Sequence, residues 1–248
     1  MLTSPPTARS REIADRVEAF VRETVIPYEG DSRIGAHGPS EELVAELREL
    51  ARRSEVMTPH ILPDGTHLTQ LETAAVLKRS GLSPLGPIAV NTMAPDEGNM
   101  YLLGKVATLA QRDRFLKKLL SGDARSAFFM TEPAEEGGAG SDPGMLKTTA
   151  RRDGDAWIID GNKTFITGAV GASVGIVMAR TDDGNKPCAT MFLVELPDPA
   201  IEVVRVLDTI DNSMPGGHSI SCFARQSERT VFRKPLPWPG LGIAVWLS

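Results

Sequence analysis

Apolar residues in the first half of the chain recur every three or four positions, which is the period of an amphipathic helix. One such run extends from Ile13 to Val25 and stops at Pro27, whose ring cannot continue a helix. A second run covers residues 43–51 and follows Pro39-Ser40. The spacing therefore predicts helices through residues 10–122.

Capping boxes, in which a Thr is followed three residues later by Glu or Gln, mark the starts of two further helices. The segment between these helices, residues 84–99, is rich in Pro, Gly and Asn, and it fits either a loop or a short helix. The boxes are Thr69 with Glu72 and Thr108 with Gln111, and the helices that they open are expected to end at Gly81 and Gly122.

From Ser126 onward, the pattern changes to short apolar runs separated by turn-forming residues. Asp153-Gly154 stands between two β-type runs and is typical of a hairpin, and Asp160-Gly161-Asn162 is expected to turn the chain again. Closely spaced strands joined by tight turns favour an antiparallel sheet or barrel over a βαβ sheet. Further strands are expected at residues 174–179, 190–195 and 201–207.

These two patterns predict an α+β protein, in which an all-helical N-terminal domain precedes an antiparallel β-barrel-like domain. The pattern changes near residues 123–127, so we expect a helical domain over residues 1–125 and a β-domain over residues 126–218. Residues 219–248 form an atypical tail with a high density of proline.

The composition is that of a globular protein, because 41% of the 248 residues are hydrophobic and 24% are charged. A net charge of −5 disfavours nucleic acid as a partner, since such binding needs clustered Lys and Arg. No segment has the ~20 apolar residues of a membrane span, and residues 1–10 lack the apolar core of a signal peptide. Two cysteines are too few for a disulfide framework, so we expect a cytoplasmic protein.

A glycine-rich loop at residues 135–142 is the first candidate for a ligand contact. Its backbone N–H groups and the Ser141 hydroxyl could face a phosphate. The loop is not a dinucleotide fingerprint, because Pro143 stands where the third glycine belongs and the following residues are strand-like. Taken alone, the loop is more simply interpreted as a surface connection.

Two β-type runs each end in an aromatic residue and a threonine, at Phe128 to Thr131 and at Phe165 to Thr167. A flavin needs such groups, because its flat ring packs on aromatic side chains and its ring nitrogens and O2 form hydrogen bonds. Each run alone is typical of an ordinary core strand with a threonine at its edge. Together they make a flavin site a candidate.

Several motifs in a fixed order resemble those of acyl-CoA dehydrogenases, and the resemblance covers about residues 13–218. Residues 129–133 and 140–142 are similar to the family's Thr-Glu-Pro…Gly-Ser-Asp signature, and residues 161–168 resemble its Gly-x-Lys-x-Trp-Ile-Thr segment. Residues 94–100, 119–122 and 215–218 resemble one long-chain subgroup of the family.

The resemblance implies a homo-oligomeric, FAD-dependent enzyme that desaturates acyl-CoA thioesters and delivers electrons to an electron-transfer acceptor in fatty acid metabolism. It places Met130 and Thr131 at the pyrimidine side of the flavin, and Thr167 near flavin N5. Phe165 takes the position of the family's usual Trp, which packs on the isoalloxazine. Ser141 matches a serine near the phosphates of FAD and CoA, in a loop that is longer here than in the family.

After His218 the chain departs from the family pattern, which continues with a Val-Pro strand end and a helical domain. In most members that domain supplies the carboxylate that removes the substrate α-proton, so we expect the chain to be inactive on its own. Glu132 and Asp142 lie near the flavin motifs, but both are more simply explained as strand-end or loop residues. Two alternatives stay open, a non-catalytic remnant that binds acyl-CoA or protein, and a flavin oxidase or monooxygenase of the same fold.

The histidines give no signal for a metal site. His37, His60 and His67 lie in the helical half without an HExxH motif or a comparable ligand set, so we expect surface or hydrogen-bonded structural residues. His218 follows a glycine pair and is expected to be a turn residue.

Overall fold

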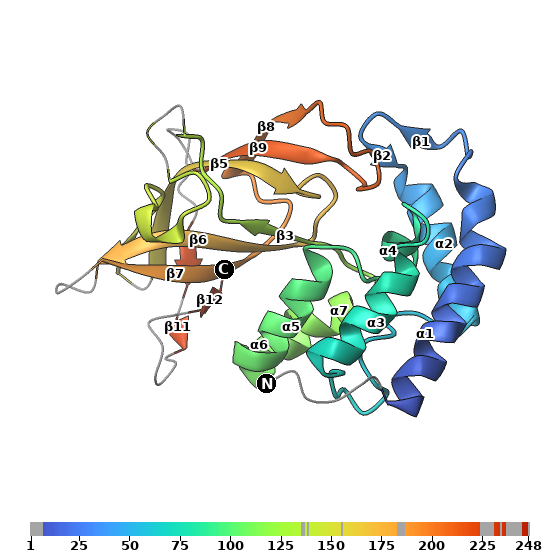
Figure 1. The fold of residues 1–248 in the computed structure, drawn as a ribbon. Coiled ribbons are helices and arrows are strands. Elements are labelled where there is room, and N and C mark those ends of the chain that lie inside the picture. Colours follow the sequence, from blue (N-terminus) through green and yellow to red (C-terminus); the bar gives the residue numbers. More distant parts are fainter. Residues whose placement is uncertain are drawn as a thin grey trace.

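Helices occupy one half of the molecule and a large sheet occupies the other, which confirms the α+β prediction (Figure 1). The structure is a computed structural model that describes residues 7–134, 137, 139–154, 156–182, 187–223, 231–233, 235–236 and 245–247. The helices are α1 (Ala8–Phe20), α2 (Glu41–Arg53), α3 (Gln70–Ser80), α4 (Gly86–Ala89), α5 (Asp96–Val106), α6 (Leu109–Gln111) and α7 (Lys117–Leu120). Strands β1 (Ile34–Gly35) and β2 (Gly38–Pro39) form a small separate sheet.

Both predicted capping boxes are present. The Thr69 hydroxyl accepts the Glu72 N–H at 3.4 Å, and the Glu72 carboxylate accepts the Thr69 N–H at 3.1 Å. Thr108 and Gln111 form the same pair of bonds at the start of α6. The sequence of residues 84–99 fits either a loop or a short helix. In the structure, this segment contains α4 and the first turn of α5, so it is helical at both places.

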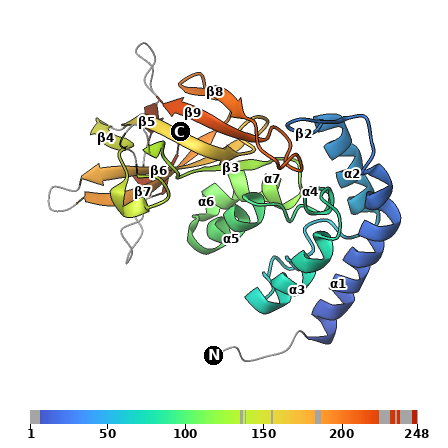
Figure 2. The ribbon, with the colours of Figure 1, turned by 45° about the horizontal axis from the view of Figure 1, so that its top comes forward.

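The helical half has its own core and a second contact with the sheet. Helices α1 to α4 enclose one apolar cluster, which includes Val17, Phe20 and Leu47. Helices α5 and α7 instead pack their apolar faces on strands β6 (Val174–Asp182) and β7 (Pro187–Glu195). Together with α6, they lie between the sheet and helices α1 to α3 (Figure 2). None of the described helices has the length and hydropathy needed to cross a bilayer.

A buried polar contact fixes the start of α5 to the start of strand β3 (Ser126–Phe129). The Asp96 carboxylate is 1% exposed and accepts both the N–H and the hydroxyl of Ser126 at 2.6 Å. Burial raises the pKa of Asp96, which the Ser126 bonds and the Arg48 guanidinium, 3.7 Å away, oppose. The helical half and the sheet are thus joined at the first strand of the sheet.

The large sheet is mostly antiparallel, as the turn pattern predicts. The described strands follow the order β11-β12-β7-β6-β4-β5-β9-β8, while β3 pairs with β6 and β10 pairs with β5. The pairings β3–β6, β4–β6 and β7–β12 are parallel, and they join strands that are not consecutive in the sequence. The remaining strands are β4 (Thr149–Asp153), β5 (Ala156–Thr167), β8 (Ile201–Leu207), β9 (His218–Phe223), β10 (Val231–Arg233), β11 (Pro235–Leu236) and β12 (Val245–Leu247).

The predicted turn at residues 160–162 is wrong, because β5 runs straight through it. This strand pairs with β4 up to Asp160 and with β9 from Gly161 onward. Gly161 has φ +152°, and a Cβ atom there would lie 2.5 Å from the Thr148 hydroxyl. Gly161 therefore lies where β5 changes its pairing partner and where only a residue without a Cβ atom fits. A glycine at this point of the sequence is also typical of a turn, so the sequence does not distinguish the two.

The sheet also extends past residue 218, where the tail was expected to begin. Strand β9 starts at His218 and pairs with both β5 and β8. Beyond Phe223, the structure describes residues 231–233, 235–236 and 245–247, which form strands β10 to β12. The predicted tail thus contributes at least its first five residues, 219–223, to the sheet.

A buried ion pair lies where the chain leaves β3 and where β5 changes partners. The Lys163 ammonium donates to Glu132 Oε1 at 3.0 Å, and the two side chains are 0% and 1% exposed. Lys163 also donates to the Met130 carbonyl at 3.0 Å. The Glu132 carboxylate accepts three backbone N–H groups as well, from Ala139, Lys147 and Thr148.

The hydrogen bonds decide the charge of this pair. Burial alone would raise the pKa of Glu132, but the bonds from Thr148, Lys147 and Lys163 outweigh it and lower the pKa to about 2. Burial lowers the pKa of Lys163 to about 8, against the opposing influence of Glu132. Both groups are therefore charged at neutral pH, and the carboxylate holds the loop after β3 against β4 and β5.

We expect Glu132→Gln to destabilise the protein by about 3–5 kcal/mol, because it leaves the Lys163 ammonium buried without a counter-charge. Adding Lys163→Met should recover part of that loss. Because the folded pKa of about 2 lies below the ordinary 4.5, the stability that Glu132 contributes is complete above pH 4.5 and is lost as the pH falls towards 2. Urea denaturation at pH 7 and pH 3 measures both effects.

The control is the pair Arg114–Glu195, which has a short contact of 2.8 Å but side chains that are 42% and 50% exposed. Glu195→Gln should cost less than about 1 kcal/mol. Two results would contradict the stabilising role of the buried pair. One is an equal loss of unfolding free energy in Glu132→Gln and Glu195→Gln. The other is the same pH dependence of stability in the wild type and in the Glu132→Gln/Lys163→Met variant.

Candidate functional site

Phe165 sits on a β-bulge that directs its ring away from the sheet. The register between β5 and β9 shifts between Lys163 and Ile166, and Phe165 has φ +55°. For a residue with a Cβ atom, this backbone conformation costs roughly 1–2 kcal/mol. Thr164 and Ile166 are buried, whereas Phe165 is 63% exposed. The fold thus holds an aromatic ring at the surface in a strained conformation, which is typical of a binding site.

The Phe165 ring borders a pocket of about 340 Å³ between the strand ends and the start of α5. Flat or apolar groups form much of its wall, and Thr167 and His218 add polar atoms at one side. Such a lining suits a flat aromatic ligand with polar edges. The other lining residues are Met93, Ala94, Pro95, Phe128, Asp211, Ser213 and Met214. A larger cavity of about 530 Å³, between residues 143–147 and strands β6 and β7, contains none of the predicted site residues.

Thr167, His218 and Asp211 form a short polar chain in this pocket. The Thr167 hydroxyl oxygen lies 2.9 Å from His218 Nδ1, and His218 Nε2 lies 3.5 Å from Asp211 Oδ2. With the carboxylate facing Nε2, the neutral ring carries its proton there, so Nδ1 accepts the Thr167 hydroxyl proton. The Thr167 oxygen keeps its lone pairs for a ligand N–H. If His218 is protonated, the Thr167 proton is released to donate instead.

Met130 and Thr131, the other predicted flavin contacts, follow β3 directly. Their carbonyl groups are used within the fold, because the Thr131 carbonyl accepts the Thr164 N–H at 2.9 Å and the Met130 carbonyl accepts Lys163. Both side chains are half-buried, and neither lines the pocket. The structure therefore brings the two predicted strand ends side by side, while Phe165 and Thr167 alone among the predicted cofactor residues reach the pocket.

Ser141 is exposed on the loop after β3 and does not line the pocket. The Glu132 N–H donates to the Gly140 carbonyl at 3.0 Å, which places the loop beside the ion pair. Asp142 accepts the Gly144 N–H at 2.8 Å and so has a local structural role. Residues 135, 136 and 138 of the predicted glycine-rich loop lie outside the described residues.

Sequence reasoning missed part of the pocket. His218 was expected to be a turn residue, but it begins β9 and contacts Thr167. Asp211 and Met93 carry no local signal, although Met93 directly precedes the motif at residues 94–100. These residues come together because β9 lies next to the last residues of β5, which only the strand order reveals.

The histidines of the helical half also differ from expectation. His60 is completely buried, and neither of its ring nitrogens has a hydrogen-bond partner among the described residues. Burial and the neighbouring His67 lower the pKa of His60 to about 3. His37 is exposed, as expected.

Known proteins share this sequence and fold. Residues 127–216 match the family of the acyl-CoA dehydrogenase middle domain. A mouse protein, acyl-CoA dehydrogenase family member 11, is 30% identical over 245 residues, which cover 87% of this chain and 31% of that protein. A Mycobacterium tuberculosis protein named as an acyl-CoA dehydrogenase is 34% identical over 210 residues, which cover 80% of this chain and 51% of that protein.

Solved structures give the same result. A Mycobacterium abscessus protein described as an acyl-CoA dehydrogenase superimposes with a TM-score of 0.75 at 32% identity, over 89% of this chain and 58% of that one. A glutaryl-CoA dehydrogenase from Mycobacterium smegmatis, solved in complex with FADH2, has a TM-score of 0.68 at 26% identity, over 88% of this chain and 53% of that one. The chain thus spans between about a third and three-fifths of the length of these relatives. By sequence and by fold, the chain is a member of the acyl-CoA dehydrogenase family, and residues 127–216 match the middle domain of that family.

Proposed function

We propose that the chain binds FAD with the flavin ring against Phe165, and that it acts in the α,β-desaturation of acyl-CoA thioesters. The strained, 63% exposed Phe165 ring beside an apolar pocket is the observation that carries this proposal. The glutaryl-CoA dehydrogenase of similar fold, which was solved with FADH2, supports the choice of cofactor. When bound, FAD accepts the hydride that leaves the β-carbon of such a substrate.

The residues present fit a flavin. Phe165, Phe128 and Met214 offer apolar surface for a flat ring, and the Thr167 hydroxyl can accept or donate according to the protonation of His218. We assign the pyrimidine side of the ring to Met130 and Thr131, which lie beside the bulge. Ser141, exposed on the neighbouring loop, is assigned to the phosphates of FAD and of the acyl-CoA.

Desaturation also requires a base for the substrate α-proton. Among the described residues that line the pocket, Asp211 is the carboxylate, and its bonds from Ser213 and then His218 lower its pKa and make it a weaker base. Glu132 is excluded as a base, because its oxygens are occupied by Lys163 and backbone N–H groups. We propose that the base comes from outside the described residues.

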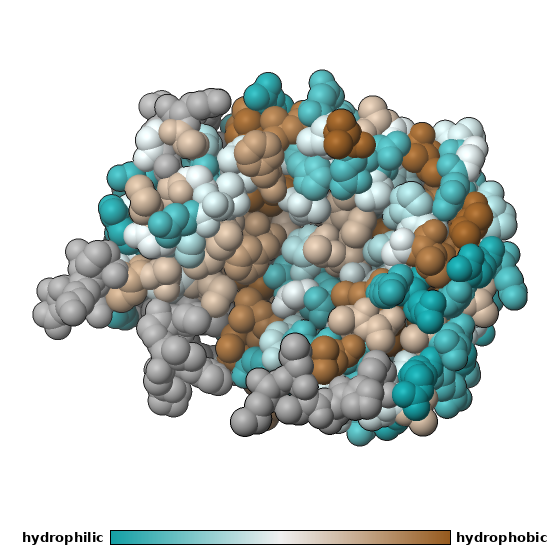
Figure 3. Space-filling model, viewed as in Figure 1, coloured by the Kyte–Doolittle hydropathy of each residue, from teal (hydrophilic) through white to brown (hydrophobic). Residues whose placement is uncertain are grey.

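Exposed apolar residues support further contacts of this protein. On the face shown in Figure 3, apolar side chains gather over α5, α6 and the adjoining edge of the sheet, where Leu109 is 80% exposed. Ile210 is fully exposed after β8. Such surface favours association, and we propose a homo-oligomer that passes electrons to an electron-transfer acceptor in cytoplasmic fatty acid metabolism.

Phe165→Gly separates the two roles of this position. Glycine adopts φ +55° without strain, so the variant without FAD should be more stable by about 1 kcal/mol, while FAD affinity should fall about tenfold or more through loss of the ring. Thr167→Val should weaken FAD binding about two- to tenfold. Thermal denaturation and FAD titration measure both quantities.

Leu71→Ala and Thr66→Val are the matched controls, because both residues lie in the helical half away from the pocket. They should leave FAD affinity unchanged. Unaltered FAD binding in both Phe165→Gly and Thr167→Val, or no FAD binding by the wild type, would contradict the proposed site.

The polypeptide of residues 1–248, loaded with FAD, should not oxidise a straight-chain acyl-CoA faster than free FAD does. A missing base alone costs about 10²–10⁴-fold. The assay couples acyl-CoA oxidation to an artificial electron acceptor. Turnover that Asp211→Asn abolishes would instead place the base in this chain, and turnover that consumes oxygen without the acceptor would identify an oxidase.

A further inference from the structure

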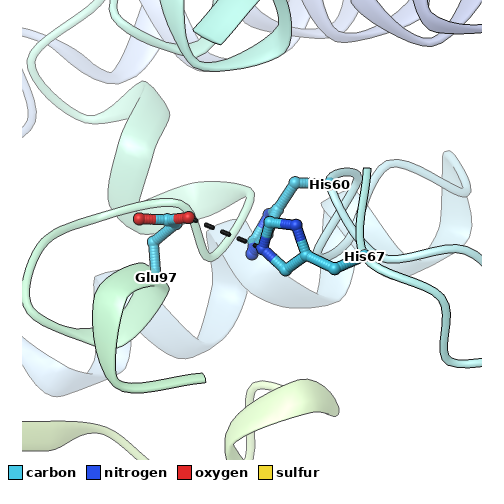
Figure 4. Close-up of side chains that lie close together, drawn as sticks. All are labelled: His60, His67 and Glu97. Atoms are coloured by element: carbon cyan, nitrogen blue, oxygen red, sulfur yellow. Dashed lines mark ion pairs between the residues drawn. The ribbon is translucent and has the colours of Figure 1, made fainter. Parts of the chain in front are cut away.

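Three side chains of types that can ligate a metal, two from one short hairpin and one from α5, meet beside α5 (Figure 4). They are His60, His67 and Glu97, and each offers a ligand atom within 4.8 Å of the others. His67 Nε2 lies 3.7 Å from Glu97 Oε1. Figure 4 shows the Glu97 carboxylate pointing towards the two imidazole rings.

A short hairpin brings the two histidines together. The Leu68 N–H donates to the His60 carbonyl, and the Leu62 N–H donates to the Thr66 carbonyl, both at 2.9 Å. Ile61 and His67 form a β-bridge between these bonds. The imidazole rings of His60 and His67 consequently lie 5.3 Å apart between their centres. The hairpin backbone, rather than a helical spacing such as HExxH, sets this geometry.

One nitrogen of each imidazole ring lies near the other ligand atoms of the cluster. His67 Nδ1 lies 2.7 Å from the Leu68 carbonyl, so it carries the ring proton and leaves the Nε2 lone pair on the side of Glu97. His67 Nε2 and both nitrogens of His60 have no hydrogen-bond partner among the described residues. A buried imidazole without partners is costly, and a metal ion would use a lone pair from each ring.

We propose that His60, His67 and Glu97 bind one Zn²⁺ ion. Two neutral imidazoles and one carboxylate form a common protein ligand set for zinc, in which a water occupies the fourth position. With metal–ligand bonds of about 2.0–2.1 Å, tetrahedral ligand atoms lie roughly 3.3 Å apart. The present separations of up to 4.8 Å close to that value by small side-chain rotations. His67 and Glu97 are 14% and 21% exposed, which leaves an access path for the ion and the water.

The zinc ion would join the hairpin to α5, two segments that the edge-to-face contact between the His67 and Tyr101 rings also connects. His60 and His67 belong to the hairpin, and Glu97 lies in the first turn of α5, two residues after Pro95 of the flavin pocket. The site is separate from the surface proposed for FAD, so a test of zinc binding does not depend on whether the chain binds FAD. Zinc should stabilise the fold, because it binds ligands that are assembled only in the folded chain.

The test uses the untagged chain of residues 1–248, freed of metal with a chelator and titrated with Zn²⁺ in a competition assay. We expect one equivalent of zinc per chain and a rise in the unfolding temperature with zinc concentration. His67→Gln and Glu97→Gln should each weaken zinc binding at least roughly tenfold, which is the effect of losing even a residue that only supports a ligand. These partly exposed positions keep the test valid if variants of the buried His60 fail to fold.

His37→Gln, Glu42→Gln and Cys188→Ser are the matched controls, since they remove potential ligands outside the cluster. Zinc affinity should stay unchanged in all three. Absence of saturable zinc uptake, or wild-type zinc affinity in both His67→Gln and Glu97→Gln, would overturn the proposal. Loss of binding in Cys188→Ser with retention in Glu97→Gln would place zinc at the thiol and overturn it equally.

Discussion

The ion pair between Glu132 and Lys163 is the constraint on which the proposed flavin surface, the pocket bordered by Phe165 and Thr167, depends. Two charges that are at most 1% exposed must satisfy each other, because neither can reach water. Lys163 holds β5 against the Met130 carbonyl, which directly follows β3. The Glu132 carboxylate accepts backbone N–H groups of the following loop, so this loop lies beside the same ion pair. The two strand ends that carry Thr131 and Phe165 consequently have one possible relative position.

That constraint also explains how the strained residue is maintained. Phe165 follows the buried Lys163 by two positions, and the residue between them, Thr164, donates its N–H to Thr131. The bulge is therefore fixed on its N-terminal side by the ion pair and this backbone bond, and on its C-terminal side by the pairing of Ile166 and Thr167 with β9. Conformational strain of this kind persists where the surroundings overdetermine it, and it allows an aromatic ring to face a ligand.

Local signals in the sequence were sufficient for elements whose geometry is local. Thr69 with Glu72 and Asp153-Gly154 act through neighbours a few residues away, so the helix start and the hairpin follow from the residues alone. Gly161 predicts a turn that the structure does not contain, because a tight turn and a strand that changes partners need the same backbone freedom. The flavin motifs indicated Phe165 and Thr167, whereas His218 and Asp211 join the pocket only through the β5–β9 pairing. The cluster of His60, His67 and Glu97 depends on how a hairpin packs against α5. No spacing of residues along the sequence predicts that packing.

FAD affinity of the Glu132→Gln/Lys163→Met variant tests most directly whether the ion pair positions the flavin surface. The variant keeps Phe165 and Thr167 and removes the two charges of the ion pair. Because the pair is buried, a cooperative unfolding transition must first confirm that the variant is folded. We expect the folded variant to bind FAD at least about tenfold more weakly than the wild type, since the strand ends lose their fixed position. Wild-type FAD affinity in the folded variant would contradict this expectation.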